Sequence, residues 1–219
     1  MPALSLQISA CAAVAAPHVR PQVHFALMEH NDGEPSDEQL MLDWRAGATA
    51  AFEQLYARHK GGVLRYLLRQ TGKREWAEEL FQDVWLNVVN ARAGYAARAR
   101  FSAWLYSIAH NRLMDHFRAY SRAHLVSYAD ADGYVEAQPT SVHEQPERRL
   151  ERKQDALVLL RLLEALPVAQ REAFVLQQEG ELSVEEIAAV TGVNRETAKS
   201  RLRYALAKLR AELAGRQDD

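Results

Sequence analysis

Residues 182–210 read LSVEEIAAVTGVNRETAKSRLRYALAKLR, which predicts a helix, a tight turn and a second helix. Ser183, with Glu186 three residues later, forms a capping box that begins the first helix. Gly192 suits a helix end in the left-handed conformation, which glycine adopts without a steric penalty. Asn194 is then a favourable N-cap for the second helix. Together these signals predict a helix-turn-helix unit.

The second helix of this unit is strongly basic. Between Asn194 and Arg210 there are six Lys or Arg residues and one Glu, although the formal net charge of the chain is only −2. A basic helix that follows a helix and a turn is typical of insertion into the major groove of DNA. A surface helix with a solvated charged face is the alternative, and the capping residues with the turn glycine favour DNA binding over it. The expected inward stripe, at helical spacing, is Val193, Ala198, Leu202, Ala205, Leu206 and Leu209.

Composition restricts the fold class and the surroundings of the protein. The 219 residues fit one large or two small domains, and a hydrophobic content of 48% is ample for buried cores. With 7 Pro and 10 Gly and abundant Ala, Leu, Arg and Glu, the chain is expected to be all-α. The single Cys11 excludes an intrachain disulfide and a zinc site made of several cysteines, and it is compatible with a reducing cytoplasm. No run approaches the roughly 18 apolar residues of a membrane span, so no stable membrane insertion is expected.

The N-terminal part of the chain lacks a sustained period. We expect residues 1–36 to be a disordered extension that ends in a polar, acidic run. The stretch LSLQISACAAVAAP resembles the apolar part of a secretory signal but has no Lys or Arg before it, which argues against export. Met28 is an alternative start of the protein, in which case residues 1–27 are not translated.

Helical periodicity divides the rest into two small helical domains joined by a flexible linker. The first domain, 37–120, is expected to hold four helices, with a break at Gly47 and an end at Gly72. Residues 121–150 are rich in Ser, Asp, Gly and Pro and predict the linker. The second domain, 151–214, contains the helix-turn-helix, with a new helix beginning at Pro167, and residues 215–219 form a tail.

The last helix of the first domain, FSAWLYSIAHNRLMDHFRAY from Phe101, alternates aromatic residues with basic ones. Single-stranded nucleic acid is bound in this way, because aromatic rings stack on unpaired bases while cations follow the phosphates. Trp104 on its own is more readily explained as a core residue, since large aromatics usually pack inside. Asn111, Arg112 and Asp115, with their polar neighbours, cannot all be buried.

Opposite charges are segregated along this domain. The fragment 98–124 carries five Arg and three His against Asp115 alone, whereas 75–83 carries four acidic residues and no basic one. Such separate patches suit a protein that has one acidic partner and one basic partner.

These motifs, in this order, resemble a bacterial RNA polymerase sigma factor. AEELFQDVWLNVV, FSAWLYSIAHNRLMDHFR and the segment from LPVAQREAFVLQQEG to the basic helix look like regions two and four of the extracytoplasmic-function class, group four of the sigma-70 family, across about 40–213. The resemblance implies binding to the largest subunits of the polymerase core, contact with promoter DNA, an anti-sigma partner and a cytoplasmic location. It also implies that the loop 91–100 and the helix 101–118 open the minus-ten element and trap an extruded base, while 151–214 reads the minus-thirty-five element.

The resemblance assigns three sets of residues. The set expected to bind core polymerase is Glu78, Glu79, Gln82, Asp83 and Trp85. The set expected at the minus-ten element is Arg98, Arg100, Trp104, Asn111, Arg112, Asp115, His116 and Arg118. The set expected at the minus-thirty-five element is Asn194, Arg195, Glu196, Thr197, Lys199, Ser200, Arg201 and Arg203. Two departures from the family pattern, the start Asn194-Arg195-Glu196 and Ala198 in place of a β-branched residue, affect which bases are read.

Nothing in the sequence indicates catalysis. There is no phosphate loop of the GxxxxGK[ST] type, no GxSxG and no HExxH, so no catalytic residue, cofactor or metal is expected. His110 and His116 are six residues apart on one helix and do not share a face well enough to bind one metal. A stand-alone helix-turn-helix regulator with a helical sensor domain, and a helical adaptor, are the alternatives. The first leaves the helix from Phe101 unexplained, and the second leaves the basic helix unexplained.

Overall fold

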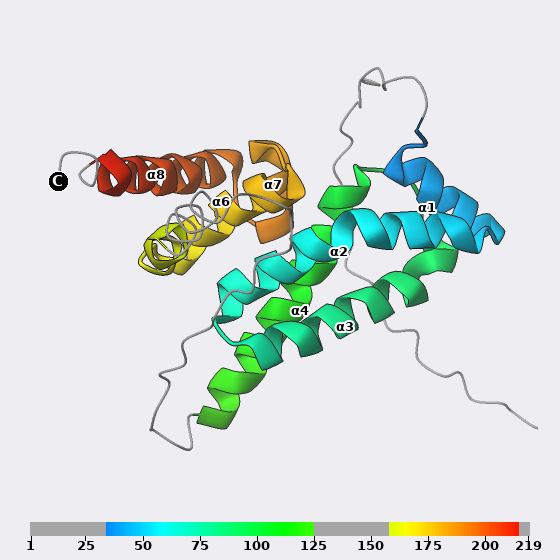
Figure 1. The fold of residues 1–219 in the computed structure, drawn as a ribbon, viewed down its shortest axis with the longest axis horizontal. Coiled ribbons are helices and arrows are strands. Elements are labelled where there is room, and N and C mark those ends of the chain that lie inside the picture. Colours follow the sequence, from blue (N-terminus) through cyan, green and yellow to red (C-terminus); the bar gives the residue numbers. More distant parts are fainter. Residues whose placement is uncertain (1–33, 125–157, 215–219) are drawn as a thin grey trace, which may run out of the picture. The chain divides into compact units, whose positions relative to one another are not determined.

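The computed structural model describes residues 34–124 and 158–214, and all regular structure in these ranges is helical. The elements, shown in Figure 1, are α1 (Asp37–Ala46), α2 (Thr49–Thr71), α3 (Arg74–Ala91), the 3-10 turn η1 (Arg92–Gly94), α4 (Phe101–His124), a helical stretch at 158–164, α6 (Val168–Gly180), α7 (Val184–Thr191) and α8 (Arg195–Ala214). The all-α prediction is therefore confirmed for the described residues.

The helix boundaries follow the local signals in the sequence. At α7, the Ser183 side chain accepts from the Glu186 backbone N–H and the Glu186 side chain accepts from the Ser183 N–H, which is the complete capping box. Gly192 ends α7 with φ 67°. The Asn194 side chain accepts from the Thr197 N–H at 2.7 Å and so caps α8. The predicted break at Gly47 is confirmed, because this residue ends α1 at φ 118°.

Two predicted boundaries of the first domain are wrong by a few residues. Helix α4 continues to His124, so the linker cannot begin at 121; Arg122 and its neighbours sustain the helix, and the Ser that suggested a break does not end it. At the other end, Ser36 caps α1 and Arg58 binds Pro35 and Glu34, so 34–36 belong to the folded unit. The other parts of the expected extension, linker and tail (1–33, 125–150 and 215–219) lie outside the described residues, as do residues 151–157 of the expected second domain.

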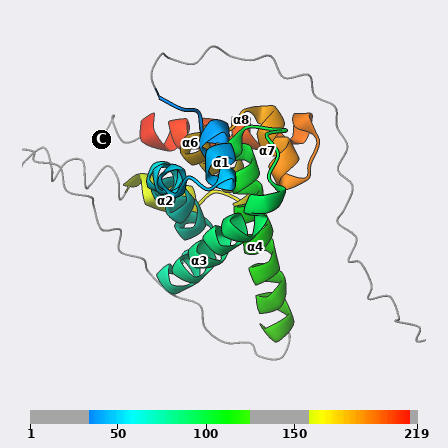
Figure 2. The same ribbon diagram turned by 90° about the vertical axis from the view of Figure 1, so that its right-hand side faces the viewer.

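Helices α1 to α4 enclose an apolar core. Leu55, Val63 and Leu67 of α2 are fully buried, as are Val84 and Val88 of α3. Figure 2 shows α3 crossing α4, and the two helices pack along their apolar faces. Trp85 extends this core as one of a group of rings that also contains Phe52, Tyr56 and Phe81. Burial of this apolar and aromatic surface holds the first four helices together.

In the C-terminal part, the expected inward stripe of α8 is confirmed. Ala198, Leu202, Ala205 and Leu209 are buried, and Val193 and Leu206 pack partly against them. Leu163 and Leu166, which precede α6, contact Ala205 and Leu209 in a smaller cluster of their own. The outward face of α8 is thereby fixed on the side away from these contacts.

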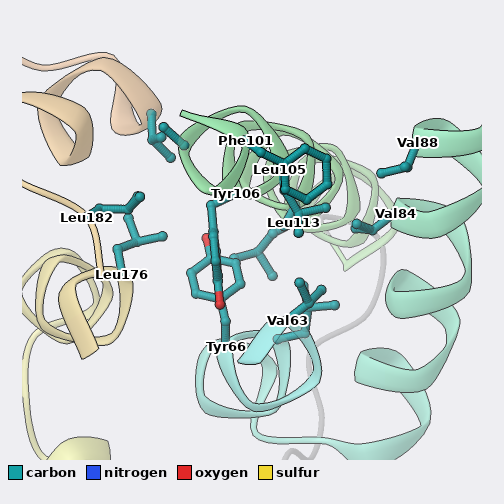
Figure 3. Close-up of a cluster of buried hydrophobic side chains, with 14 of the residues drawn as sticks. Val63, Tyr66, Val84, Val88, Phe101, Leu105, Tyr106, Leu113, Leu176 and Leu182 are labelled. Atoms are coloured by element: carbon teal, nitrogen blue, oxygen red, sulfur yellow. The ribbon is translucent and has the colours of Figure 1, made fainter. Parts of the chain in front are cut away.

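Helices α6 and α7 also pack against α2 and α4 of the first four helices. Figure 3 shows Leu176 and Leu182 on one side of this contact and Tyr66 with Tyr106 on the other. All four side chains are at least 99% buried and belong to one continuous hydrophobic cluster. The sequence pattern, which predicts two domains, does not predict this contact between them.

Candidate nucleic-acid interface

The polar face of α8 is open in the structure. Asn194, Arg195, Glu196, Lys199 and Arg203 are exposed. The other three members of the set predicted to read the minus-thirty-five element are half-buried: Thr197, Ser200 and Arg201. Because the buried stripe occupies the opposite side of the helix, these side chains share one accessible surface. This geometry suits insertion into a major groove.

Arg195, the first arginine of this face, is paired with two acidic side chains. The Arg195 guanidinium donates to Glu185 of α7 and, at 3.1 Å, to the adjacent Glu196. The hydrogen bond from Arg195 lowers the pKa of Glu185 below its usual value. Both side chains are more than half exposed, so the pair is open to solvent and contributes little to stability. It holds Arg195 at the start of α8 without closing the face.

The predicted minus-ten residues fall into two groups along the loop and α4. At the N-terminal end, Arg98 is exposed in the loop and Arg100 donates to the Glu181 backbone oxygen at 3.0 Å. Trp104 lies against Tyr95 and Phe101, with ring centroids 5.0 and 5.6 Å away. The ring of Trp104 is only half-buried, so one part of it is core and the rest is accessible.

Tyr95 was not identified from the sequence and supports this end of α4. It is buried beside Trp104, and burial, followed by the charges of Glu38 and Asp37, raises its pKa to about 12. Its backbone oxygen accepts from Arg45 of α1, while Glu38 accepts the Phe101 N–H at 2.6 Å. These contacts fix the loop 95–100 to α1. A single Tyr in an Ala- and Arg-rich loop carried no periodic signal that could have identified it.

The C-terminal group on α4 is tied together by ion pairs. Asp115 binds Arg112 at 3.3 Å and Arg118 at 3.1 Å, and all three side chains are at least 40% exposed. Asn111 is exposed one position before Arg112. The charged groups on this surface are available to a ligand, with Asp115 orienting the two guanidinium groups.

His116, which is expected at the minus-ten element, packs against aromatic side chains. Its ring packs on Trp76 of α3 at 4.9 Å, with Phe117 at 5.9 Å on α4. Its Nε2 is buried and has no hydrogen-bond partner among the described residues. The spacing along α4 could not show this, because Trp76 comes from a different helix.

The predicted polymerase-binding set occupies the exposed side of α3, with one exception. Glu78, Glu79, Gln82 and Asp83 are exposed, and Glu78 pairs with Arg74 at 2.8 Å. Trp85 is a correction: only 6% of it is accessible, since it lies among the rings of the core, and it offers no surface to a partner. The exposed apolar residues of the same helix are Leu86 (58%) and Val89 (43%), which the sequence analysis did not select.

The described residues contain neither a candidate metal site nor a membrane-spanning helix. Within 34–124 and 158–214, His, Cys, Asp and Glu side chains do not form a group of three or more that could hold a metal ion. Over the same ranges, none of the helices is long and apolar enough to cross a membrane. His110 pairs with Glu172 instead.

Comparison with known proteins matches two family models to the chain. Residues 55–123 match the family Sigma-70 region 2, and residues 156–209 match Sigma-70, region 4. The chain is 35% identical over 175 residues to RNA polymerase sigma factor CarQ of Myxococcus xanthus, covering 80% of this chain and 95% of that protein. It is 31% identical to ECF RNA polymerase sigma factor SigM of Mycobacterium tuberculosis, covering 83% and 86%.

A solved structure shares the fold. It is the sigma factor RpoE in complex with the anti-sigma factor NepR from Bartonella quintana, with a TM-score of 0.60 and 23% identity over 74% of this chain and 96% of that one. Region two, region four and the full-length relatives together define the class: the chain belongs to the extracytoplasmic-function group of the sigma-70 family of RNA polymerase sigma factors, which direct transcription initiation.

Proposed function

We propose that this protein binds the RNA polymerase core and gives it promoter specificity, with α4 opening the minus-ten element and α8 reading the minus-thirty-five element. The observation that carries the proposal is the accessible basic face of α8 in a chain that also has the aromatic, Arg-bearing α4. A helix-turn-helix alone would support binding to duplex DNA. The second nucleic-acid surface supports strand opening as well.

Arg195 and Lys199 are the proposed principal contacts of α8, because both are exposed near its N-terminus, the part of a recognition helix that meets base edges. An arginine that is bidentate to guanine discriminates against other bases by about 1–3 kcal/mol. A lysine that meets a phosphate strengthens binding to any sequence and increases its salt dependence. For Arg195, binding DNA requires exchange of Glu185 and Glu196 for the base edge.

The N-terminal end of α4 is the proposed site where the minus-ten strand is held. Extruding a base costs a few kcal/mol of lost stacking. Ring contacts and polar groups in a pocket must offset this free energy. Trp104 is half accessible and rigidly backed by Tyr95 and Phe101, so it can stack on a base without rearrangement. Arg98 and Arg100 lie just before it, where the phosphates of that strand would pass.

The exposed side of α3 is the proposed contact with the largest polymerase subunits. Glu78, Glu79 and Asp83 supply acidic charge beside the neutral Gln82. Leu86 and Val89 supply exposed apolar area on the same helix. We further propose a cytoplasmic location, no catalytic activity of its own and no cofactor, since RNA synthesis belongs to the core. An anti-sigma partner is proposed from RpoE, the fold relative whose structure contains the anti-sigma factor NepR.

Run-off transcription with purified core polymerase on a promoter library tests the proposal. We expect promoter-dependent transcripts only when the protein is added. Asp83→Ala should weaken association with core and leave binding to duplex DNA unchanged, whereas the matched control Glu75→Ala, also an exposed acid on α3, should do neither. DNA binding without core association or transcripts would indicate a stand-alone regulator instead.

A further inference from the structure

An acidic residue of α7 reaches the recognition surface on α8. Glu185 lies in the first turn of α7, and Arg195 is the first residue of α8. The turn at Gly192 brings these two positions, 10 residues apart in the sequence, side by side. Arg195 Nε donates to Glu185 Oε1, and Arg195 Nη1 donates to Oε1 of the adjacent Glu196 at 3.1 Å. Two of the three nitrogens of this guanidinium therefore face carboxylates.

The position of Glu185 is fixed by its helix, but its carboxylate is open to solvent. The capping box of Ser183 and Glu186 holds the first turn of α7 in place around it. The hydrogen bond between the two side chains lowers the pKa of Glu185 and raises the pKa of Arg195, so both groups are charged at neutral pH. Arg195 is 56% and Glu185 59% exposed. Another anion can therefore replace Glu185 on Arg195 without any change in the packing of the helices.

The pairing with acids distinguishes one cation of this face from the others. Lys199 and Arg201 have no ion pair among the residues that the structure describes. Arg203 lies over the ring of its neighbour Tyr204, 5.1 Å from the centroid. Within the same part of the chain, Arg195 is the one of these four cations that carboxylates hold. It is also the arginine proposed to read a base edge.

A DNA duplex offers this guanidinium two kinds of partner. Phosphates are present at every base pair, and a contact with them carries no sequence information. Guanine presents O6 and N7 together in the major groove, and one arginine can bind both atoms. Discrimination between sequences therefore falls if Arg195 is free to move to a phosphate.

Glu185 weakens the contact with phosphates more than the contact with guanine. While it is paired with Glu185, the Arg195 side chain contributes no net charge to the sequence-independent attraction between α8 and the phosphates. An arginine that leaves a carboxylate for a phosphate only exchanges one anion for another, and it leaves Glu185 unpaired beside a negatively charged strand. Guanine can offset the loss of the pair, because a bidentate contact in the groove is stronger than an exposed ion pair.

We propose that Glu185 is a specificity-determining residue of the helix-turn-helix, which withholds Arg195 from phosphates and releases it to guanine. Glu185 acts through Arg195 and is therefore a positioning residue, whereas Arg195 is the reader of the base. The proposal rests on the proposed function, because it requires α8 to enter the major groove of the minus-thirty-five element. It adds a residue of α7, outside the recognition helix, to those that determine which promoters are read.

Binding to duplex DNA of random sequence tests the proposal directly. Fluorescence anisotropy is measured with the full chain over a series of salt concentrations. Glu185→Gln, which keeps the size of the side chain and removes its charge, should tighten binding about two- to fivefold. The slope of log K against log salt concentration should steepen by about 0.9, the value for one added phosphate contact. Glu212→Gln, the same change at an exposed position near the end of α8, is the control and should leave the slope unchanged.

A double-mutant cycle separates the release of Arg195 from a general loss of negative charge. In an Arg195→Ala background there is no guanidinium to release, so Glu185→Gln should neither tighten binding nor steepen the slope. Equal effects in the two backgrounds would show that Glu185 only repels phosphates, and this result overturns the proposal. A pair with a purely structural role would instead lower the midpoint of thermal unfolding in Glu185→Gln and leave the salt slope unchanged, which also overturns it.

Discrimination between sequences is the second measurement. The promoter duplex recovered from the run-off library is compared with the random duplex, and Glu185→Gln should lower the ratio of the two affinities about two- to fivefold. An unchanged ratio, or a random duplex that Glu185→Gln binds no more tightly than the parent does, overturns the role of Glu185 even when the parent supports transcription. If the parent yields no promoter-dependent transcript, the proposed function fails, and the salt slopes on the random duplex still decide whether Glu185 withholds Arg195.

Discussion

The core of α1 to α4 and the contact of α6 and α7 with α2 and α4 are both buried, but by different chemistry. The core contains fully buried aliphatic residues and a group of rings in edge-to-face contact around Trp85. The contact adds to its apolar residues two carboxylates, two arginines and two tyrosine hydroxyls. When apolar side chains are exposed to water, no favourable interaction replaces the one that is lost. Charged side chains, by contrast, are hydrated again when they are exposed. The core is therefore held by apolar burial, whereas the contact also depends on paired polar groups.

The largest expected effect comes from breaking the core. Leu55→Ala removes a fully buried side chain of α2 and should lower the free energy of unfolding by about 2–5 kcal/mol. Denaturant unfolding measures this loss. Leu86→Ala, exposed on α3, should change stability by no more than about 0.5 kcal/mol. A loss of similar size for Leu86→Ala would contradict the assignment of the stability to the core around Leu55.

Next in size is the loss of the first arginine of α8. Arg195→Ala should weaken binding to minus-thirty-five duplex DNA by about 1–3 kcal/mol and relax base preference, measured by fluorescence anisotropy on a set of sequences. Arg210→Ala, exposed at the far end of α8, is the control. An equal loss for Arg210→Ala would contradict the assignment of base contact to Arg195.

A smaller effect is expected at the N-terminus of α7. Ser183→Ala removes half of the capping box and should cost about 1 kcal/mol in stability, seen as a lower midpoint in thermal unfolding followed by circular dichroism. Ser183→Asp, which retains a capping oxygen, should recover most of the loss. Equal destabilisation by Ala and Asp would mean that the cap does not limit the stability of the helix-turn-helix.

The smallest effect concerns acid stability of the first four helices. Burial acts to raise the pKa of Asp37, but hydrogen bonds from His59 and Arg58 outweigh it, and the net pKa is lowered. The interaction of Asp37 with His59 and Arg58 therefore stabilises the fold above the unfolded pKa of about 4. This contribution to the free energy of unfolding disappears as the pH falls below that value. Asp37→Asn should remove up to about 1 kcal/mol of this pH dependence, measured by urea unfolding between about pH 3 and pH 6. Asp43→Asn on the same helix is the control, and an equal response in both would contradict the assignment to Asp37.

Local signals in the sequence predicted most of the fold and one of the proposed DNA surfaces. The capping box, the turn at Gly192 and the inward stripe of α8 are confirmed, because each depends on residues within one or two turns of each other. Prediction was less complete on α3 and α4. Periodicity identified their apolar faces, but it could not decide whether Trp85 ends in the core or at its edge, nor that His116 packs on Trp76.

By itself, then, the sequence determined the helices, their ends and the resemblance that places the chain among sigma factors. Only the tertiary structure decided that the two regions meet through Glu172 and Glu179, and that Arg100 lies beside the helix-turn-helix. The reason is the separation along the sequence over which each interaction acts. Caps and helical periods are set by neighbours three or four residues away, whereas Tyr66 and Glu172 are separated by 106 positions and have no shared pattern until the chain folds.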